Sequence, residues 1–112
     1  MEFDFLKPIS EEVVAFISGL NSQHLGSKMV LHTNKQFPDI NKIKIAIIGV
    51  LDNRGDSKAI SDVDLTPIRK ELYSLYPGNW EASIADLGDI EAGNSIEDTY
   101  FALKSVVSNL IK

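Results

Sequence analysis

The sequence predicts an α/β fold built around a parallel sheet, and three observations support this expectation. Residues 43–51 form an apolar run of strand length, residues 82–87 form a second run, and helical patterns stand between and after them. Alternation of strands and helices is typical of parallel sheets with right-handed crossover connections. The expected order is an N-terminal helix followed by strand, helix, strand and helix.

Residues 1–41 are predicted to form an N-terminal extension with one helix. Ser10 has the character of an N-cap, and Glu11 and Glu12 place negative charge in the first turn. Apolar residues then recur at helical spacing, at Val13, Phe16, Ile17 and Leu20. Residues 29–31 are apolar but too few to establish a period, so a short strand there stays open.

Residues 43–51 are predicted to be a strand that is apolar on both sides. Six of the nine residues are Val, Ile or Leu, and the run does not alternate with polar residues after Ile45. Such a strand must be covered on both faces, as it is in a parallel sheet between helices. We therefore expect it in the middle of a sheet.

The second helix is expected to begin with Thr66 as its cap and Pro67 at its first position, and to end before Pro77-Gly78. Four residues at helical spacing predict its buried stripe, namely Ile68, Leu72, Leu75 and Tyr76.

The second strand is predicted at residues 82–87 and a loop at residues 88–94. Trp80 is expected to pack the preceding helix against this strand. Ser95 and Asp98 resemble a capping box at the start of the last helix. Its apolar stripe is predicted to contain Tyr100, Leu103, Val107 and Leu110.

Two or three strands make only a narrow sheet, and the last predicted helix has no glycine cap after it. Fraying of a terminal helix is one interpretation. We favour the other, that the sequence is cut from a longer α/β protein, because a strand as apolar as residues 43–51 fits the middle of a wider sheet.

The composition excludes several classes of partner and location. With 11 basic and 16 acidic residues, the net charge of −5 repels phosphate backbones and anionic lipids, so neither nucleic acid nor a membrane is expected as a partner. The absence of cysteine fits a reducing compartment, and residues 1–5 lack the basic start of a signal peptide. The sequence therefore predicts a cytoplasmic protein.

Acidic and turn-forming residues follow both predicted strands, where open α/β sheets bind ligands. Carboxylates that converge there can bind a hard cation or act as acid and base. The favoured alternative is an ordinary pair of turns, because Asp, Asn and Gly are the usual turn formers. The candidates for a substrate rim are Asp52, Asn53, Arg54, Asp56, Asp86 and Asp89.

No catalytic or metal-binding residue is predicted in these 112 residues, and no cofactor of their own. Gly49 and Gly55 do not form a dinucleotide fingerprint, and no P-loop or nucleophile elbow is present. Gly49 is expected instead to permit close approach of a neighbouring backbone. His24 and His32 have no carboxylate at metal-ligand spacing and are expected on the surface or in loops.

Three pieces of the sequence resemble the ureohydrolases, the family of arginase, agmatinase and formimidoylglutamase. Residues 45–50 with Gly55 resemble the family's first strand and turn, and Ile68-Arg69 resembles a pair in the helix that follows. Residues 86–89, Asp-Leu-Gly-Asp, resemble the D-x-G-[DN] motif that closes the family's second strand. The resemblance covers about residues 42–112, with formimidoylglutamase as the nearest guess.

The resemblance implies the N-terminal part of an arginase-like fold, a three-layer αβα arrangement with a parallel sheet. It also implies two Mn²⁺ ions bridged by a hydroxide that attacks a guanidino or formimino carbon. The family's ligand motifs, Gly-Gly-Asp-His, Asp-Ala-His-x-Asp and Ser-x-Asp-x-Asp, do not occur here. Leu51 replaces the proline of the family's Gly-Val-Pro, and Asp64-Leu65 replaces its Gly-Pro.

Two hypotheses follow. In the first, the chain is the N-terminal segment of a hydrolase acting on C–N bonds other than peptide bonds. It is inactive alone, its partner is the remainder of the parent chain, and its exposed sheet edges favour self-association. In the second, the chain is a non-catalytic binding or assembly module of α/β type.

Overall fold

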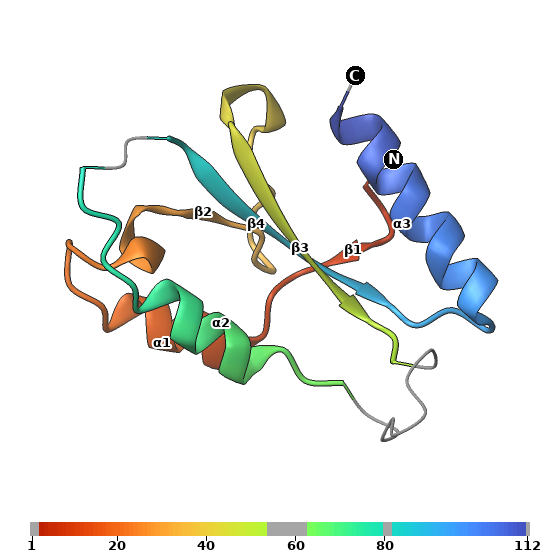
Figure 1. Cartoon of the computed structure of the whole chain (residues 1–112), viewed down its shortest axis with the longest axis horizontal. Coiled ribbons are helices and arrows are strands. Elements are labelled where there is room, and N and C mark those ends of the chain that lie inside the picture. Colours follow the sequence, from red (N-terminus) through yellow and green to blue (C-terminus); the bar gives the residue numbers. More distant parts are fainter. Residues whose placement is uncertain (1–2, 54–62, 80–81, 112) are drawn as a thin grey trace.

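Three α-helices and a four-stranded sheet make up the described part of the protein. The computed structural model describes residues 3–53, 63–79 and 82–111 (Figure 1). Trp80, Arg54, Gly55 and Asp56 lie outside these ranges. The elements, in chain order, are β1 (Leu6–Lys7), α1 (Glu11–Ser18), β2 (Val30–Leu31), β3 (Ile45–Leu51), α2 (Thr66–Tyr73), β4 (Ile84–Glu91) and α3 (Ile96–Leu110), with short 3-10 helices at Leu25–Lys28 and Ile40–Lys42.

The strand at the centre of the sheet is β4, whereas the sequence placed β3 there. One edge of β4 pairs with β3 in parallel along its length, from Ile84 to Glu91. The other edge pairs first with β2, in parallel at Ala85 and Asp86, and then with β1. No strand among the described residues pairs with the second edge of β3. The expected central strand is therefore an edge strand in this chain.

The sheet is mixed and not wholly parallel, because β1 runs antiparallel to β4. Leu6 and Lys7 pair with Ile90 and Asp89, so β4 continues through residues predicted to be a loop. Residues 1–41, treated from sequence as an extension, supply β1, β2 and α1. The short strand that the sequence left undecided at residues 29–31 is present as β2.

A β-bulge interrupts β4 at Leu87-Gly88. Ile47 and Gly49 of β3 are two residues apart, but their partners Asp86 and Asp89 on β4 are three apart. The extra residue reverses the alternation of side chains, so Asp86 and Asp89 share one face although a regular strand would separate them. Gly88 has φ of +95°, the left-handed region that favours glycine.

Helices cover both faces of the sheet, as the sequence predicted (Figure 1). On one face, α1 and α2 enclose a core cluster of Ile9, Val13, Ile17 and Tyr73. On the other face, α3 packs against β1 and β4 in a cluster of Leu6, Ala85, Leu87, Ile90, Ala102 and Val106. Residues of β3 alternate between these layers, with Ile47 beside the first cluster and Ile48 beside the second.

The buried faces of α2 and α3 differ from the predicted ones. On α2, Arg69 and Tyr73 are buried and Ile68 is more than half exposed. Leu75 and Tyr76, predicted to belong to the same stripe, lie beyond the end of α2 and are also more than half exposed. On α3, Thr99, Ala102 and Val106 face the sheet. The predicted stripe residues Tyr100 and Val107 are 65% and 40% exposed. The predicted stripe residues Leu72, Leu103 and Leu110 do pack beside the two clusters, so the predicted faces are correct in part. The most buried positions of each helix, however, are not the residues of its predicted stripe.

Local capping was predicted well at two helices and wrongly at the third. The Ser10 and Ser95 side chains accept hydrogen bonds from the N–H groups of Val13 and Asp98, as expected. Thr66, predicted as the cap of α2, is already helical, and its N–H donates to Asp64 Oδ1 at 3.0 Å. Asp64 therefore satisfies the start of this helix, because its carboxylate lies two residues before the first free amide.

Within the described ranges, no helix is long and apolar enough to cross a membrane.

Candidate functional site

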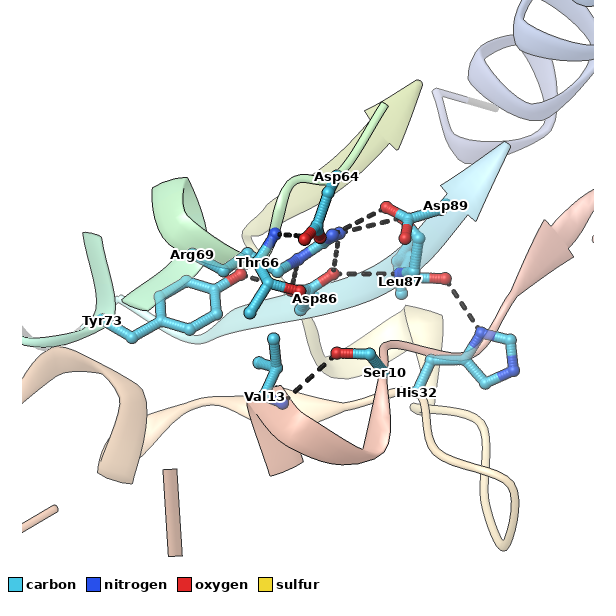
Figure 2. A network of polar contacts seen from close by, with 11 residues as sticks. Ser10, Val13, His32, Asp64, Thr66, Arg69, Tyr73, Asp86, Leu87 and Asp89 are labelled. Carbon is cyan, nitrogen blue, oxygen red and sulfur yellow. Dashed lines mark hydrogen bonds and ion pairs between the residues drawn. The ribbon is translucent and has the colours of Figure 1, made fainter. Parts of the chain in front are cut away.

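A buried polar network lies between α2 and β4, centred on Arg69 (Figure 2). The Arg69 side chain is 6% exposed and lies between two carboxylates of β4. Its Nε donates to Asp86 Oδ2 at 2.7 Å and its Nη2 to Asp86 Oδ1 at 3.1 Å, a bidentate pair. Its Nη1 lies 2.7 Å from Asp89 Oδ1. One guanidinium therefore serves two acids.

Asp86 is fully buried, and both of its oxygens accept hydrogen bonds. Besides Arg69, the Tyr73 hydroxyl donates to Oδ2 and the Gly88 N–H donates to Oδ1 at 3.0 Å. Four donors around one carboxylate leave it few free lone pairs with which to bind a substrate or a cation. Asp86 thus joins α2 to β4 as a structural residue of the network.

Asp89 is less well satisfied. Its Oδ1 is buried and accepts no well-aligned hydrogen bond within the described residues, although it forms the ion pair with Arg69. This oxygen lies over Gly49 of β3, where a Cβ would approach it to 2.0 Å. The close approach expected at Gly49 therefore occurs, but a carboxylate makes it in place of the predicted backbone.

Burial and charge displace the pKa values of this network. Burial alone lowers the pKa of Arg69, but hydrogen bonds and charge from Asp86 and Asp89 outweigh it and raise that pKa. Burial, with the nearby charge of Asp86, raises the pKa of the Tyr73 phenol. Burial also raises the pKa of Asp89 above its ordinary 3.8, against the opposing effect of Arg69. Arg69 and Tyr73 therefore keep their protons at neutral pH.

Two local features position the network. Arg69 and Tyr73 are four residues apart on α2 and so lie on one face of the helix, above β4. The bulge at Gly88 turns Asp89 to the same face as Asp86. Asp64 lies near the network, where its charge contributes to the raised pKa of Asp89. A hydrogen bond from the Thr66 N–H lowers the pKa of Asp64 itself.

Replacing Asp89 by asparagine should give a stability difference that depends on pH. Because folding raises the pKa of Asp89 above 3.8, the folded chain holds this proton more tightly than the unfolded chain. The free energy of unfolding of the wild-type chain therefore falls as the pH rises from 3.8 to the pKa of Asp89 in the folded chain. Asparagine does not titrate, so the variant lacks this loss. Urea unfolding at about pH 3 and about pH 7 measures this difference. The free energy of unfolding of the variant, relative to that of the wild type, should be higher at about pH 7 than at about pH 3. A difference that stays constant or reverses would contradict the charge state inferred here.

The other rim candidates do not join this network. Asp52 follows β3 on the opposite face of the sheet, where its Oδ2 accepts a hydrogen bond from the Thr99 hydroxyl at 2.6 Å. Asn53, the next residue in the sequence, is half-buried. Arg54 and Asp56 fall outside the described residues. The structure thus brings together Asp86 and Asp89, but not Asp52.

The two histidines lie in loops, as predicted. His24 stacks on Tyr76, with ring centroids 4.8 Å apart. His32 is half-buried, and its Nδ1 lies 2.9 Å from the Leu87 carbonyl oxygen, so it donates a hydrogen bond to the bulge of β4.

Arg69, Tyr73 and Gly88 are the network members that were not predicted as site residues. The sequence contains part of the signal for them. Arg69 and Tyr73 are four residues apart, the spacing of one helix face, and the two acids of Asp-Leu-Gly-Asp are three residues apart. A spacing of three implies one face of a strand only when a bulge is known to intervene. No group of three or more His, Cys, Asp or Glu residues within the described ranges can hold a metal ion.

The chain was compared with protein-family models, with curated proteins and with solved structures, and none of the three comparisons gave a match.

Proposed function

We propose that these residues are the N-terminal segment of a cytoplasmic, ureohydrolase-like enzyme of the arginase, agmatinase and formimidoylglutamase type. Such an enzyme hydrolyses C–N bonds, other than peptide bonds, in guanidino or formimino compounds. In this proposal the segment contributes no catalytic residue, and its partner is the remainder of the parent chain. In the whole enzyme, this segment would support one side of the active site.

One observation carries the proposal: the three separate pieces of the resemblance meet in space. Gly49 belongs to the first piece, Arg69 to the second, and Asp86 with Asp89 to the third. Arg69 pairs with both acids, and Asp89 Oδ1 occupies the space that Gly49 leaves open. Residues that match a family at distant positions and then form one buried contact set support a shared local structure more strongly than any single motif does.

The residues described here do not fit the two Mn²⁺ ions that the resemblance implies. Divalent Mn²⁺ needs several oxygen or imidazole ligands with free lone pairs. Asp86 already accepts four hydrogen bonds, Asp89 is paired with Arg69, and no other acidic or histidine cluster is present in these ranges. In this proposal the metal ions are therefore bound by the remainder of the parent chain, and the described residues perform no catalytic step.

The test compares the 112-residue chain with the complete reading frame that contains it. The short chain is expected to bind no Mn²⁺ at stoichiometric level by calorimetry and to release no urea or formamide. The complete product, loaded with Mn²⁺, is expected to hydrolyse a guanidino or formimino compound. A Mg²⁺ titration controls for weak binding to the net charge of −5. Stoichiometric Mn²⁺ with turnover by the short chain, or an inactive complete product, would contradict the proposal.

The second candidate is a non-catalytic binding or assembly module. It is favoured by apolar side chains on α2 and α3 and just after each helix that are more than half exposed, namely Ile68, Leu75, Tyr76, Tyr100 and Ile111. Exposed apolar surface of this kind marks sites of protein association. The same experiment separates the two candidates, because the module predicts no hydrolysis by any form of the protein.

A further inference from the structure

In the part of the chain that the structure describes, the outer edge of β3 lacks the usual sequence protections of an edge strand. Edge strands usually carry a lysine, a proline or a bulge, or they are very short. β3 has seven residues from Ile45 to Leu51, none charged and none proline, and its bulge lies on the neighbouring strand β4. Ile45 N–H donates to the Ser83 carbonyl oxygen in the β4 direction. By alternation, Ala46, Ile48 and Val50 direct their N–H and C=O groups to the open edge.

An uncovered apolar groove runs beside this edge, on the α3 face of the sheet. It has a volume of about 320 Å³ and lies between β3 and the C-terminal half of α3, where it is lined by Ile43, Ala46, Ile48, Val107, Leu110 and Ile111. A second hollow, of about 190 Å³, continues the same face with Val50, Ile96, Tyr100 and Leu103. The exposed stripe of α3 thus overlooks the open edge along the whole helix.

We propose that the open edge of β3 pairs antiparallel with β3 of a second copy of this chain, about a two-fold axis at Ile48. In this register Ile48 faces Ile48 of the second copy, and Ala46 faces Val50. All three are residues that direct their backbone groups outward, so every free N–H and C=O of the strand finds a partner.

The charges at the two ends of β3 favour this occupant and this register. Lys44 precedes the strand and Asp52 follows it, and both lie on the groove side. Each of them is four positions from Ile48 along the chain, so Lys44 of one copy lies opposite Asp52 of the other at both ends. Asp52 keeps its hydrogen bond from Thr99, which fixes the carboxylate at the end of the strand.

The same symmetry covers the apolar stripe of α3. A two-fold axis normal to the sheet keeps both α3 helices on one face, so their stripes approach each other across the joined β3 strands. Tyr100, Val107 and Ile111, which are 65%, 40% and 78% exposed in one copy, then lie over the shared grooves. This inference concerns the 112-residue chain and does not depend on the hydrolase proposal.

Single cysteine variants test the register, because the chain has no cysteine of its own. Opposed residues of a hydrogen-bonded antiparallel pair have Cα atoms about 5.5 Å apart, within disulfide range. Ile48→Cys should therefore form a covalent dimer under mild oxidation. Ala46→Cys, on the same face of the same strand, should stay uncrosslinked, because its two copies are displaced by four residues, roughly 13 Å along the strand. Equal cross-linking of the two variants would overturn the register.

Sedimentation of the unmodified chain tests the association itself, with a dimer of twice 12.4 kDa expected. Lys44→Glu should raise the dimer dissociation constant by roughly 5-fold, and adding Asp52→Lys should restore it, because each charge pair occurs twice. A monomer at about 100 μM, or a Lys44→Glu effect that Asp52→Lys fails to reverse, would overturn the proposal. Circular dichroism of each variant separates lost pairing from lost folding.

Discussion

Replacing Arg69 by methionine is expected to lower the free energy of unfolding at pH 7 by about 3–5 kcal/mol. Among the described residues, Arg69 is the one cation that forms an ion pair with Asp86 or Asp89. Its loss leaves two carboxylates buried side by side without a counter-charge, and removal of one partner from a buried pair is strongly destabilising. Urea unfolding at neutral pH measures the loss.

A second measurement of this variant tests its cause. If the loss arises from uncompensated carboxylates, protonation should relieve it, so the difference from the wild type should shrink at about pH 4. Lys70→Met is the matched control on the next position of α2. Lys70 pairs with Glu12 at 2.6 Å, but their side chains are 35% and 65% exposed. Its loss should cost below about 1 kcal/mol, and an equal cost at both positions would contradict the role assigned to Arg69.

Replacing Gly88 by alanine is expected to cost about 3–5 kcal/mol, as the sum of backbone strain and a steric clash. Gly88 has φ of +95°, and an added Cβ would lie 1.9 Å from the Lys7 carbonyl oxygen. That oxygen belongs to the backbone of β1 and cannot rotate away, so β1 must move or the bulge must change. Urea unfolding gives the cost, and amide exchange at Leu6 and Lys7 should become faster if β1 detaches.

Gly78→Ala provides the comparison for this second prediction. Gly78 also has positive φ, +68°, but within the described ranges no heavy atom apart from its chain neighbours lies within 4 Å of its added Cβ. Its substitution therefore measures backbone strain without the clash, about 1–2 kcal/mol. Equal losses at both glycines would show that contact with β1 contributes nothing to the stability of the bulge.

Features that depend on neighbouring residues in the sequence were predicted from the sequence. The first helix follows from the Ser10 cap and from Val13 and Ile17 at helical spacing, and both of these are buried. The strand β3 follows from its composition. The position of β3 at an edge of the sheet does not follow from the sequence. The other edge of β4 is occupied by β1 and β2, which have two residues each, and no local sequence pattern specifies their pairing.

The buried faces of α2 and α3 were predicted only in part, for a physical reason. Apolar periodicity selects the most hydrophobic stripe of a helix, but the docked face also depends on what the sheet presents. Against α2 the sheet presents Asp86, which needs the donors of Arg69 and Tyr73. Against α3 it presents Leu87 and Ile90, beside which the small Ala102 fits closely. Partner chemistry and close packing therefore outweighed periodicity at both helices.

The bulge at Gly88 also separates the length of β4 from its pattern of faces. Deletion of Gly88 alone would restore a regular strand in which Asp89 directly follows Leu87, so every side chain would keep its present face. A regular strand that kept Gly88, with each residue opposite one residue of β3, would instead turn every later side chain over, so Asp89 would face the cluster of Leu87 and Ala102 while Ile90 would face Arg69. The glycine thus fits the two layers only as a bulge, and an in-frame loss of it would leave the acid and the apolar residue in their own layers.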